Sequence, residues 1–100
     1  MNAIYKLKFN LGQIVATPGA LEVLQASGQT PQFFLDKHVS GDWGEVCEED
    51  KMLNDQSLVD GSRLLSAYRT LKGERLWIIT EAVGDDGRRS SSTILRPSEY

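Results

Sequence analysis

Leu76-Trp77-Ile78-Ile79-Thr80 is the stretch of sequence that decides the fold of this chain. Like Leu64-Leu65-Ser66-Ala67-Tyr68 before it and Ser92-Thr93-Ile94-Leu95 after it, this stretch is rich in residues that favour β-strands. Turn-forming residues separate the three stretches at Lys72-Gly73 and at Gly84-Asp85-Asp86-Gly87. The C-terminal part of the chain therefore predicts a three-stranded antiparallel meander.

The first hairpin of this meander has a predicted register. A two-residue turn at Lys72-Gly73 pairs Tyr68 with Trp77, Ser66 with Ile79 and Leu64 with Glu81. Both faces of such a hairpin are rich in apolar side chains, so both should be covered. We expect helices on one face, and an N-terminal strand or a second subunit on the other.

Two helices are predicted by a repeated start signal. Thr17-Pro18 and Thr30-Pro31 each combine a hydroxyl that accepts from a free amide with a proline at the first helical position, where its missing N–H costs nothing. Gly28 ends the first helix, and the second ends near Gly41. Helices joined by so few residues should pack as neighbours.

A third helix is predicted over residues 45–53, with Val46, Met52 and Leu53 turned inward. Acidic residues near its N-terminus complement the helix dipole. Asn54-Asp55 then caps one further short turn, which Gly61 closes.

The N-terminal part predicts extended structure. Apolar and polar residues alternate from Tyr5 to Leu11, which is typical of a half-buried strand. Gly12 interrupts the run before Ile14-Val15-Ala16, and suits a bulge or a tight turn between two short extended pieces. Together with the three to four short helices and the meander, this predicts a single α+β domain over residues 1–100.

Composition limits the class of function. The chain has 100 residues, of which 40% are hydrophobic and 25% charged, as in an ordinary globular domain. A net charge of −3 and scattered basic residues argue against nucleic-acid binding, because phosphate contacts need clustered Lys and Arg. Cys47 is the single cysteine, so no intramolecular disulfide forms. We see no signal-peptide pattern or membrane span, and expect a soluble cytoplasmic protein without a cofactor.

The candidate functional site centres on His38-Val39-Ser40-Gly41-Asp42-Trp43-Gly44, which joins the only histidine to an acid and a tryptophan between glycines. Turns of this composition are typical of binding loops. We expect this turn to meet the acids that follow it and the polar positions of the strands. The predicted binding residues are His38, Asp42, Trp43, Glu49, Asp50, Asn54, Ser66, Tyr68, Thr80 and Glu81.

The residues of the turn also have a structural interpretation. His38 stands at a helix C-terminus, where an imidazolium is favoured by the dipole and by the free carbonyls. Asp42 can cap the next helix, and Trp43 can fill the core with its N–H bonded to a carbonyl.

The other polar residues have structural interpretations too. The acids can form a solvated face, with Glu49 or Asp50 paired to Arg63 as a further option. The polar strand positions can form an internal hydrogen-bond network instead of the floor of a site. Cys47 lies beside an acidic segment, which disfavours a thiolate, so we interpret it as a small packed residue.

A catalytic alternative uses the same cluster. In a small hydrolase-like enzyme, His38 would act as the base, with Asp42 or Glu49 orienting it. This requires the histidine to face a cavity within hydrogen-bond reach of a carboxylate. The acids match no calcium loop and have no accompanying histidine-carboxylate ligand set, so we predict no metal site and assign no catalytic residue.

Segments spread over nearly the whole chain match a family pattern. They are Leu11 to Ala20, His38 to Gly44, Glu49-Asp50 with Asn54, Gly61 to Tyr68, Trp77 to Glu81 and Pro97-Ser98-Glu99-Tyr100. With them the chain resembles a family of small bacterial proteins from plasmids and other mobile DNA. Members carry the label plasmid-related protein or type I restriction endonuclease subunit M. The second label does not fit, because adenine methylation needs a Rossmann-like cofactor domain that this pattern lacks.

The resemblance implies a protein encoded on mobile DNA and assigns it no activity. The polar and aromatic side chains gathered around His38 to Gly44 predict a small interaction module, which binds a protein partner or a second copy of itself. Small size and acidity also fit an inhibitor of host defence or a toxin-antitoxin partner, because an acidic face can imitate nucleic acid. The net charge of −3 is small for such a mimic.

Overall fold

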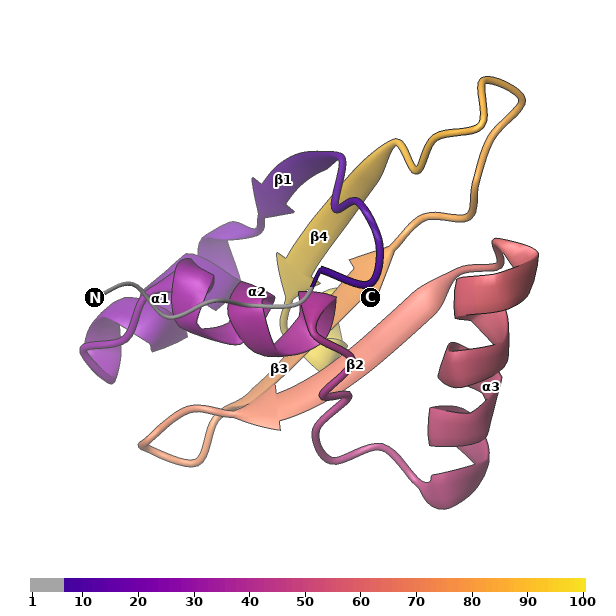
Figure 1. Cartoon of the computed structure of the whole chain (residues 1–100). Coiled ribbons are helices and arrows are strands. Elements are labelled where there is room, and N and C mark those ends of the chain that lie inside the picture. The colour runs from indigo at the N-terminus through magenta and orange to yellow at the C-terminus, as the bar shows by residue number, and fades with distance from the viewer. Residues whose placement is uncertain (1–6) are drawn as a thin grey trace, which may run out of the picture.

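The computed structural model describes residues 7–100, which fold into helices and one sheet (Figure 1). The predicted α+β class is confirmed. In chain order the elements are β1 (Gln13–Ala16), α1 (Pro18–Ala26), α2 (Pro31–Val39), α3 (Glu48–Asp60), β2 (Leu64–Arg69), β3 (Arg75–Thr80), β4 (Ser91–Leu95) and the 3-10 helix η1 (Pro97–Glu99).

The sheet is mixed, with the strand order β1-β4-β3-β2. β2, β3 and β4 are successive antiparallel neighbours, as the meander prediction requires. The prediction of three strands is wrong, because β1 adds a fourth strand parallel to β4. The apolar run Ile14-Val15-Ala16 thus pairs with a strand edge that would otherwise carry unpaired backbone groups.

The segment before β1 also differs from its prediction. The alternation from Tyr5 to Leu11 predicts a strand, but the described part of this run is irregular, and its first two residues lie outside the described residues. The Lys8 N–H donates to the Val39 carbonyl at the end of α2, at 2.9 Å. Phe9 stacks on Trp43 with ring centroids 6.2 Å apart. Contacts with α2 and Trp43 hold this segment, so its alternation does not produce a strand.

The β2–β3 hairpin differs from its predicted register by one residue. The tip between Arg69 and Arg75 is longer than the predicted two residues, and the Thr70 N–H donates to the Glu74 carbonyl within it at 2.8 Å. A slip of one residue moves each side chain to the opposite face. The face toward the helices therefore carries a buried set: Leu64, Ser66, Tyr68, Leu76, Ile78 and Thr80.

α1 and α2 cover this face of the sheet, and their predicted start signals are confirmed in part. The Thr17 side chain accepts from the Ala20 N–H at the start of α1, at 3.2 Å, whereas Thr30 makes no such bond at the start of α2. Burial of each large apolar side chain contributes roughly 2 kcal/mol to folding. The core consists of Ala20, Val23, Leu24, Phe34, Leu35, Tyr68, Leu76, Ile78 and Ile94.

α3 stands beside β2, apart from α1 and α2 (Figure 1). The predicted break at Asn54 is wrong, because the helix continues past it and ends at Gly61, whose φ of +81° favours glycine. Met52 and Leu53 were predicted to face inward, but they are 71% and 54% exposed. The buried residues of this helix are instead Asn54 and Ser57, both polar.

The outer edge of β2 is covered by the residues that precede α3. The Glu45 N–H donates to the Ala67 carbonyl at 2.6 Å, and the Ala67 N–H donates to the Trp43 carbonyl at 3.1 Å. Gly44 lies between these bonds with φ +75°, and a Cβ there would collide with the Ala67 carbonyl oxygen. The turn from His38 to Gly44 therefore ends against the edge strand, where a side chain at Gly44 would break the contact.

The second face of the sheet is partly covered. Trp77 lies on this face and contacts Tyr100, with ring centroids 5.6 Å apart. The prediction that an N-terminal strand covers the face is wrong, because β1 extends the edge of the sheet. The C-terminal residues border this face instead.

Candidate functional site

His38 lies at the centre of a buried chain of polar side chains. From the last turn of α2, its Nδ1 is 2.5 Å from Ser66 Oγ on β2, and its Nε2 is 2.8 Å from Thr80 Oγ1 on β3. Thr80 Oγ1 is 2.7 Å from Ser92 Oγ on β4. The Ser92 hydroxyl then donates to the Leu11 carbonyl at 2.7 Å. This hydrogen-bond chain ties α2 to three strands and to the segment before β1.

The Leu11 carbonyl, at the end of the hydrogen-bond chain, determines the direction of every hydrogen bond in it. A hydroxyl has a single hydrogen, and Ser92 donates its own to Leu11, so Ser92 accepts from Thr80. Thr80 in turn accepts from His38 Nε2–H, and His38 Nδ1 accepts from the Ser66 hydroxyl. Each of these side chains is satisfied with the ring neutral and in one tautomer.

The environment of His38 opposes protonation. Burial and, to a smaller extent, the positive charge of Arg89 lower the pKa of His38 from 6.5 to about 3. The predicted role of an imidazolium at the end of α2 is therefore wrong. The base mechanism is also unsupported, because both ring nitrogens meet hydroxyls instead of a carboxylate and the side chain is fully buried.

Asp42 closes the turn after α2. Its carboxylate accepts from the Gly44 N–H at 3.2 Å and lies 3.8 Å from Lys37 Nζ. The predicted capping of the next helix by Asp42 is wrong, because the residue at the N-cap of α3 is Cys47. The exposed carboxylate therefore stabilises its own turn, whereas both ring nitrogens of His38 meet hydroxyl groups.

Trp43 fills the core, as its structural interpretation predicts. Its Nε1–H donates to the Asp55 carboxylate on α3 at 3.0 Å, where a carbonyl acceptor was expected. Tyr68 is buried beside it, and its hydroxyl donates to the Asp42 carbonyl at 2.5 Å. Burial raises the pKa of the Tyr68 phenol, so this group stays protonated. Both aromatic residues thus fasten the turn to the sheet and to α3.

Asn54 attaches α3 to the edge of β2. Its amide nitrogen donates to the Leu65 carbonyl at 2.7 Å, and its amide oxygen accepts from the Leu65 N–H at 3.1 Å. One side chain therefore replaces a missing strand neighbour at this residue. Together with the hydrogen bonds at Ala67, the Asn54 side chain occupies backbone groups at the edge of β2 that could otherwise pair with another strand.

Asn54→Ala is expected to lower the free energy of unfolding by about 2 kcal/mol, because two backbone groups of β2 lose their partner. Asn54→Asp should also destabilise, since a carboxylate accepts from the Leu65 N–H but repels its carbonyl. Gln56→Ala, at an exposed position of the same helix, is the control, with an expected change below about 0.5 kcal/mol. Urea denaturation measures all three, and equal effects of Asn54→Ala and Gln56→Ala would contradict the role of Asn54.

The predicted acids lie away from His38. Glu49 and Asp50 are exposed in the first turn of α3. Within residues 7–100 neither pairs with Arg63, which donates to the Tyr100 hydroxyl at 2.9 Å. Glu81 follows β3 at the opposite end of the sheet from the hairpin tip. The structure therefore brings three of the predicted residues, His38, Ser66 and Thr80, into one network. Outside it, Glu49 and Asp50 are exposed and Glu81 is half-buried.

Arg89 is a buried residue that the sequence analysis did not identify. Its guanidinium donates to the carbonyls of Ser62, Glu81 and Ser57 at 2.7, 3.0 and 3.1 Å. These carbonyls belong to the residues before β2, the residue after β3 and the last turns of α3. The sequence contains no signal that separates Arg89 from its neighbour Arg88, which is exposed.

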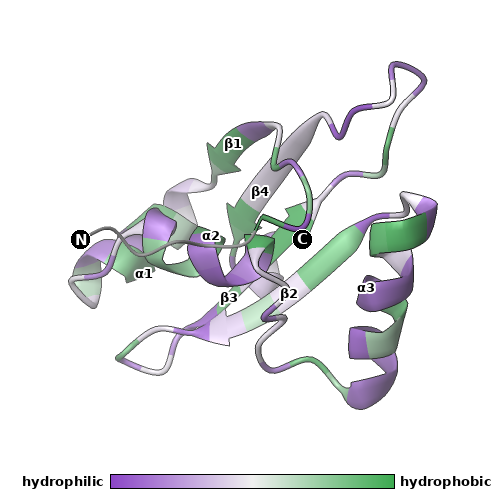
Figure 2. Ribbon diagram, viewed as in Figure 1, coloured by the Kyte–Doolittle hydropathy of each residue, from purple (hydrophilic) through white to green (hydrophobic). Residues whose placement is uncertain are grey.

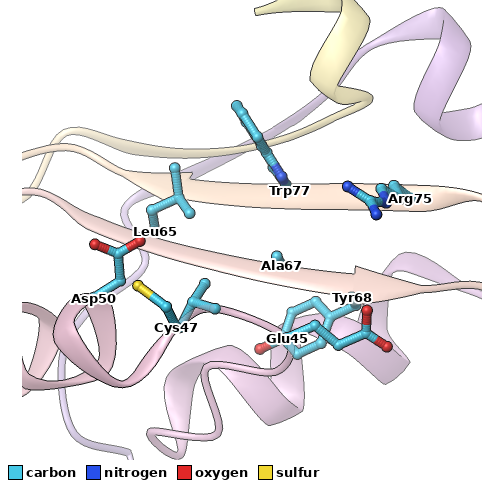
Figure 3. A pocket seen from close by; sticks show the side chains of 9 residues that line it. Glu45, Cys47, Asp50, Leu65, Ala67, Tyr68, Arg75 and Trp77 are labelled. Atoms are coloured by element: carbon cyan, nitrogen blue, oxygen red, sulfur yellow. The ribbon is translucent and has the colours of Figure 1, made fainter.

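A hollow of about 280 Å³ lies between the start of α3 and the second face of the sheet (Figure 3). Trp77 and Arg75 on β3 line one side, and Cys47 and Asp50 line the other. Cys47 is exposed, so the prediction of a packed cysteine is wrong. Among the described residues, no buried side-chain nitrogen or oxygen lacks a hydrogen-bond partner.

Among the helices of residues 7–100, α3 carries the most exposed large apolar side chains. Met52, Leu53 and Val59 are 71%, 54% and 89% exposed, and Figure 2 shows apolar turns of α3 in green among hydrophilic turns in purple. We call these three residues the α3 face. Ordinary surface helices turn such side chains toward the core. α3 reverses this pattern because polar contacts attach it to the body.

Other classes of site find no support in residues 7–100. No group of three or more His, Cys, Asp or Glu residues there is placed to hold a metal ion. No helix in that range is both long and apolar enough to cross a membrane. Comparisons with protein-family models, with curated proteins and with solved structures find no match. The functional argument therefore rests on the residues of the chain itself.

Proposed function

We propose that this chain is a small protein-binding module and that the α3 face is its docking surface. The supporting observation is that Met52, Leu53 and Val59 are turned to solvent along one helix. Contiguous exposed apolar side chains are typical of surfaces that a partner covers. In keeping with the resemblance to mobile-element proteins, the partner would be a protein of the same mobile DNA or of its host.

The attachment of α3 supports this role. Asn54, Asp55 and Ser57 hold the helix through hydrogen bonds to Leu65, Trp43 and Arg89, so that its apolar side chains are free for another surface. A helix attached in this way keeps its position without burying Met52 or Val59. The binding surface is therefore prepared before a partner arrives, which lowers the entropic cost of association.

The buried His38 network serves a different purpose in this proposal. It joins α2 to the sheet beneath the turn that leads to α3, so it positions the docking helix from within. The predicted binding residues His38, Ser66 and Thr80 then act as structural support. Glu49 and Asp50 remain candidates for direct contact, because they are exposed on α3 itself.

Photo-crosslinking tests the docking surface. A photoreactive amino acid at Gln56, between Met52 and Val59 on the helix, should trap a partner in cells that produce the chain, whereas the same group at Lys72 should not. The double variant Met52→Ser with Val59→Ser should remove the product. Leu71→Ser is the matched control, because Leu71 is an equally apolar residue, 81% exposed, at the β2–β3 tip. Crosslinking that survives the double variant, or that occurs equally at Lys72, would overturn the proposal.

A further inference from the structure

The charge of the chain is concentrated around α3. Residues 42–60 carry seven carboxylates and one lysine, whereas the rest of the chain carries seven carboxylates and ten basic residues. The net charge of −3 is therefore the sum of a charge near −6 on residues 42–60 and a positive net charge on the rest of the chain. Such a segment attracts basic partners and repels a second acidic helix.

The carboxylates flank the apolar residues along α3. Met52 and Val59 are seven residues apart, so they lie on one side of the helix, about 10 Å from each other along its axis. At about 100° per residue, Glu48 and Asp55 fall on one side of this line, and Glu49 and Asp60 fall on the other. On the first side, Asp55 also accepts from the Trp43 Nε1–H, and Glu48 lies 3.4 Å from Lys51 Nζ. An apolar stripe thus runs between two acidic borders.

The stripe ends in a recess. At the C-terminal end of α3, Leu58, Val59 and Val83 form the apolar wall of a hollow of about 210 Å³, and Arg88 and Arg89 line it as well. Val83 is itself 43% exposed. The apolar wall of this recess suits one apolar side chain of a partner, while its arginines keep a Lys or Arg of the partner out. Met52, at the other end of the stripe, offers a flexible contact.

We infer that the partner segment is a basic amphipathic helix, with apolar residues spaced over two turns and with Lys or Arg on both flanks. This inference rests on the proposed function and specifies its partner. The occupant must bring apolar side chains for the stripe and positive charges for its borders. A second copy bound through the same face would place acids of two helices against one another, so a symmetric α3–α3 dimer is disfavoured.

The charge inference is tested with model peptides and the full chain. The probe is a labelled amphipathic helix of leucine and lysine, with leucines on one side. The control is a peptide of the same composition whose leucines are scattered. The affinity of the amphipathic peptide, measured by fluorescence anisotropy, should be about tenfold higher than that of the control, because only the amphipathic peptide presents an apolar stripe. An amphipathic leucine-glutamate peptide should not bind, and added salt should weaken the leucine-lysine complex.

Variants of the chain locate the contact. The double variant Met52→Ser with Val59→Ser should lose about tenfold in affinity with all carboxylates intact, and Glu48→Gln with Glu49→Gln should lose severalfold with the stripe intact. Asp85→Asn with Asp86→Asn removes an equal charge at the exposed β3–β4 loop, and should change affinity less than about twofold. Equal losses in the last two double variants would show that the peptide responds to overall charge, and would overturn the inference.

The outcomes also separate this inference from the proposed function. If a partner is crosslinked at Gln56 but the chain shows no preference for the leucine-lysine helix, the proposed function stands and the inference of a basic helical partner is overturned. Sedimentation velocity of the full chain tests whether a second copy of the chain occupies the α3 face. A concentration-dependent dimer that the Met52 and Val59 double variant abolishes would assign the α3 face to a second copy, and would overturn the inference.

Discussion

Lowering the pH from about 7.5 to about 5 is expected to reduce the free energy of unfolding by about 2 kcal/mol through His38 alone. The pKa of this side chain is about 3 in the folded protein and near 6.5 when exposed. Between these values the unfolded chain binds a proton that the folded chain excludes. Stability is therefore complete above pH 6.5 and falls as the pH decreases, with a limiting slope of about 1.4 kcal/mol per pH unit.

The physical reason is the hydrogen-bond chain around the ring. In the neutral form, Ser66 donates to Nδ1 and Nε2–H donates to Thr80, so an added proton on Nδ1 would face a donor. The ring is fully buried, and Arg89 adds a repulsive charge. Extended down to pH 3, the same linkage would cost about 4 kcal/mol, which approaches the whole stability of many small domains.

Carboxylates contribute at lower pH and do not interfere with this window. The pKa values of Asp60 and Glu99 are lowered in the folded state by hydrogen bonds, so their contribution is present above their unfolded values of 3.8 and 4.5 and is lost as the pH falls through the folded values. Above pH 5 the chain has no other histidine to titrate. The slope in this range therefore reports on His38.

Urea denaturation at several pH values measures this slope, and His38→Gln is the comparison because it removes the titrating ring. The variant should be less stable at pH 7.5 and nearly independent of pH down to 5. Should it fail to fold, proton NMR of the single histidine in the unchanged protein gives a second reading. Its ring resonance should stay constant over this range, and a titration midpoint near pH 6.5 would contradict the buried neutral state.

Local signals in the sequence predict several elements well. Thr17-Pro18 and Thr30-Pro31 mark the starts of α1 and α2 as expected, because proline placement depends only on neighbouring residues, although only Thr17 makes the expected capping bond. Gly61 ends α3 for the same reason. The antiparallel order of β2, β3 and β4 also follows from the spacing of turn residues between apolar runs.

Features that depend on distant contacts are not visible in the sequence. The hairpin register depends on Thr70 and Glu74, which extend the tip beyond Lys72-Gly73. The orientation of α3 depends on Asn54, whose partner Leu65 cannot be identified before the helix is placed beside β2. A hydrophobic pattern therefore predicts the wrong inward face for this helix, since the anchoring contacts are polar.

The candidate site shows the same division. The sequence correctly places the turn from His38 to Gly44 near the polar strand positions Ser66 and Thr80. It does not reveal whether the histidine is exposed or buried, because both states follow from the same pattern. Whether any of the predicted residues binds a partner stays a prediction, and the Glu48→Gln with Glu49→Gln double variant tests it for Glu49.

Replacing Arg89 by methionine is expected to lower the free energy of unfolding by about 3 kcal/mol. Methionine fills much of the space but leaves the carbonyls of Ser62 and Glu81 without the donors that the guanidinium supplies. A buried acceptor that loses its partner costs about 1–3 kcal/mol. The Ser57 carbonyl is less affected, because the Gly61 N–H also donates to it at 2.9 Å.

Arg88→Met is the matched control, because it changes the same residue type one position away at an exposed site. Its effect should stay below about 0.5 kcal/mol. Arg89→Lys should fall between the two, since a single ammonium cannot reach three carbonyls arranged around a planar fork. We call the contacts of Arg89 with the three carbonyls the Arg89 clamp. Chemical denaturation of the three variants measures this order, and equal losses of stability for Arg88→Met and Arg89→Met would contradict the clamp.

The same substitution links the clamp to the histidine. Because the charge of Arg89 contributes to the low pKa of His38, Arg89→Met should raise that pKa while burial still keeps it below 6.5. As the pH is lowered, the loss of stability caused by His38 should then stop at a higher pH than in the unchanged protein. Arg89→Lys retains the charge and should keep the original profile in spite of its lower stability. A profile that moves equally in both variants would show that the clamp acts on His38 through packing instead of charge.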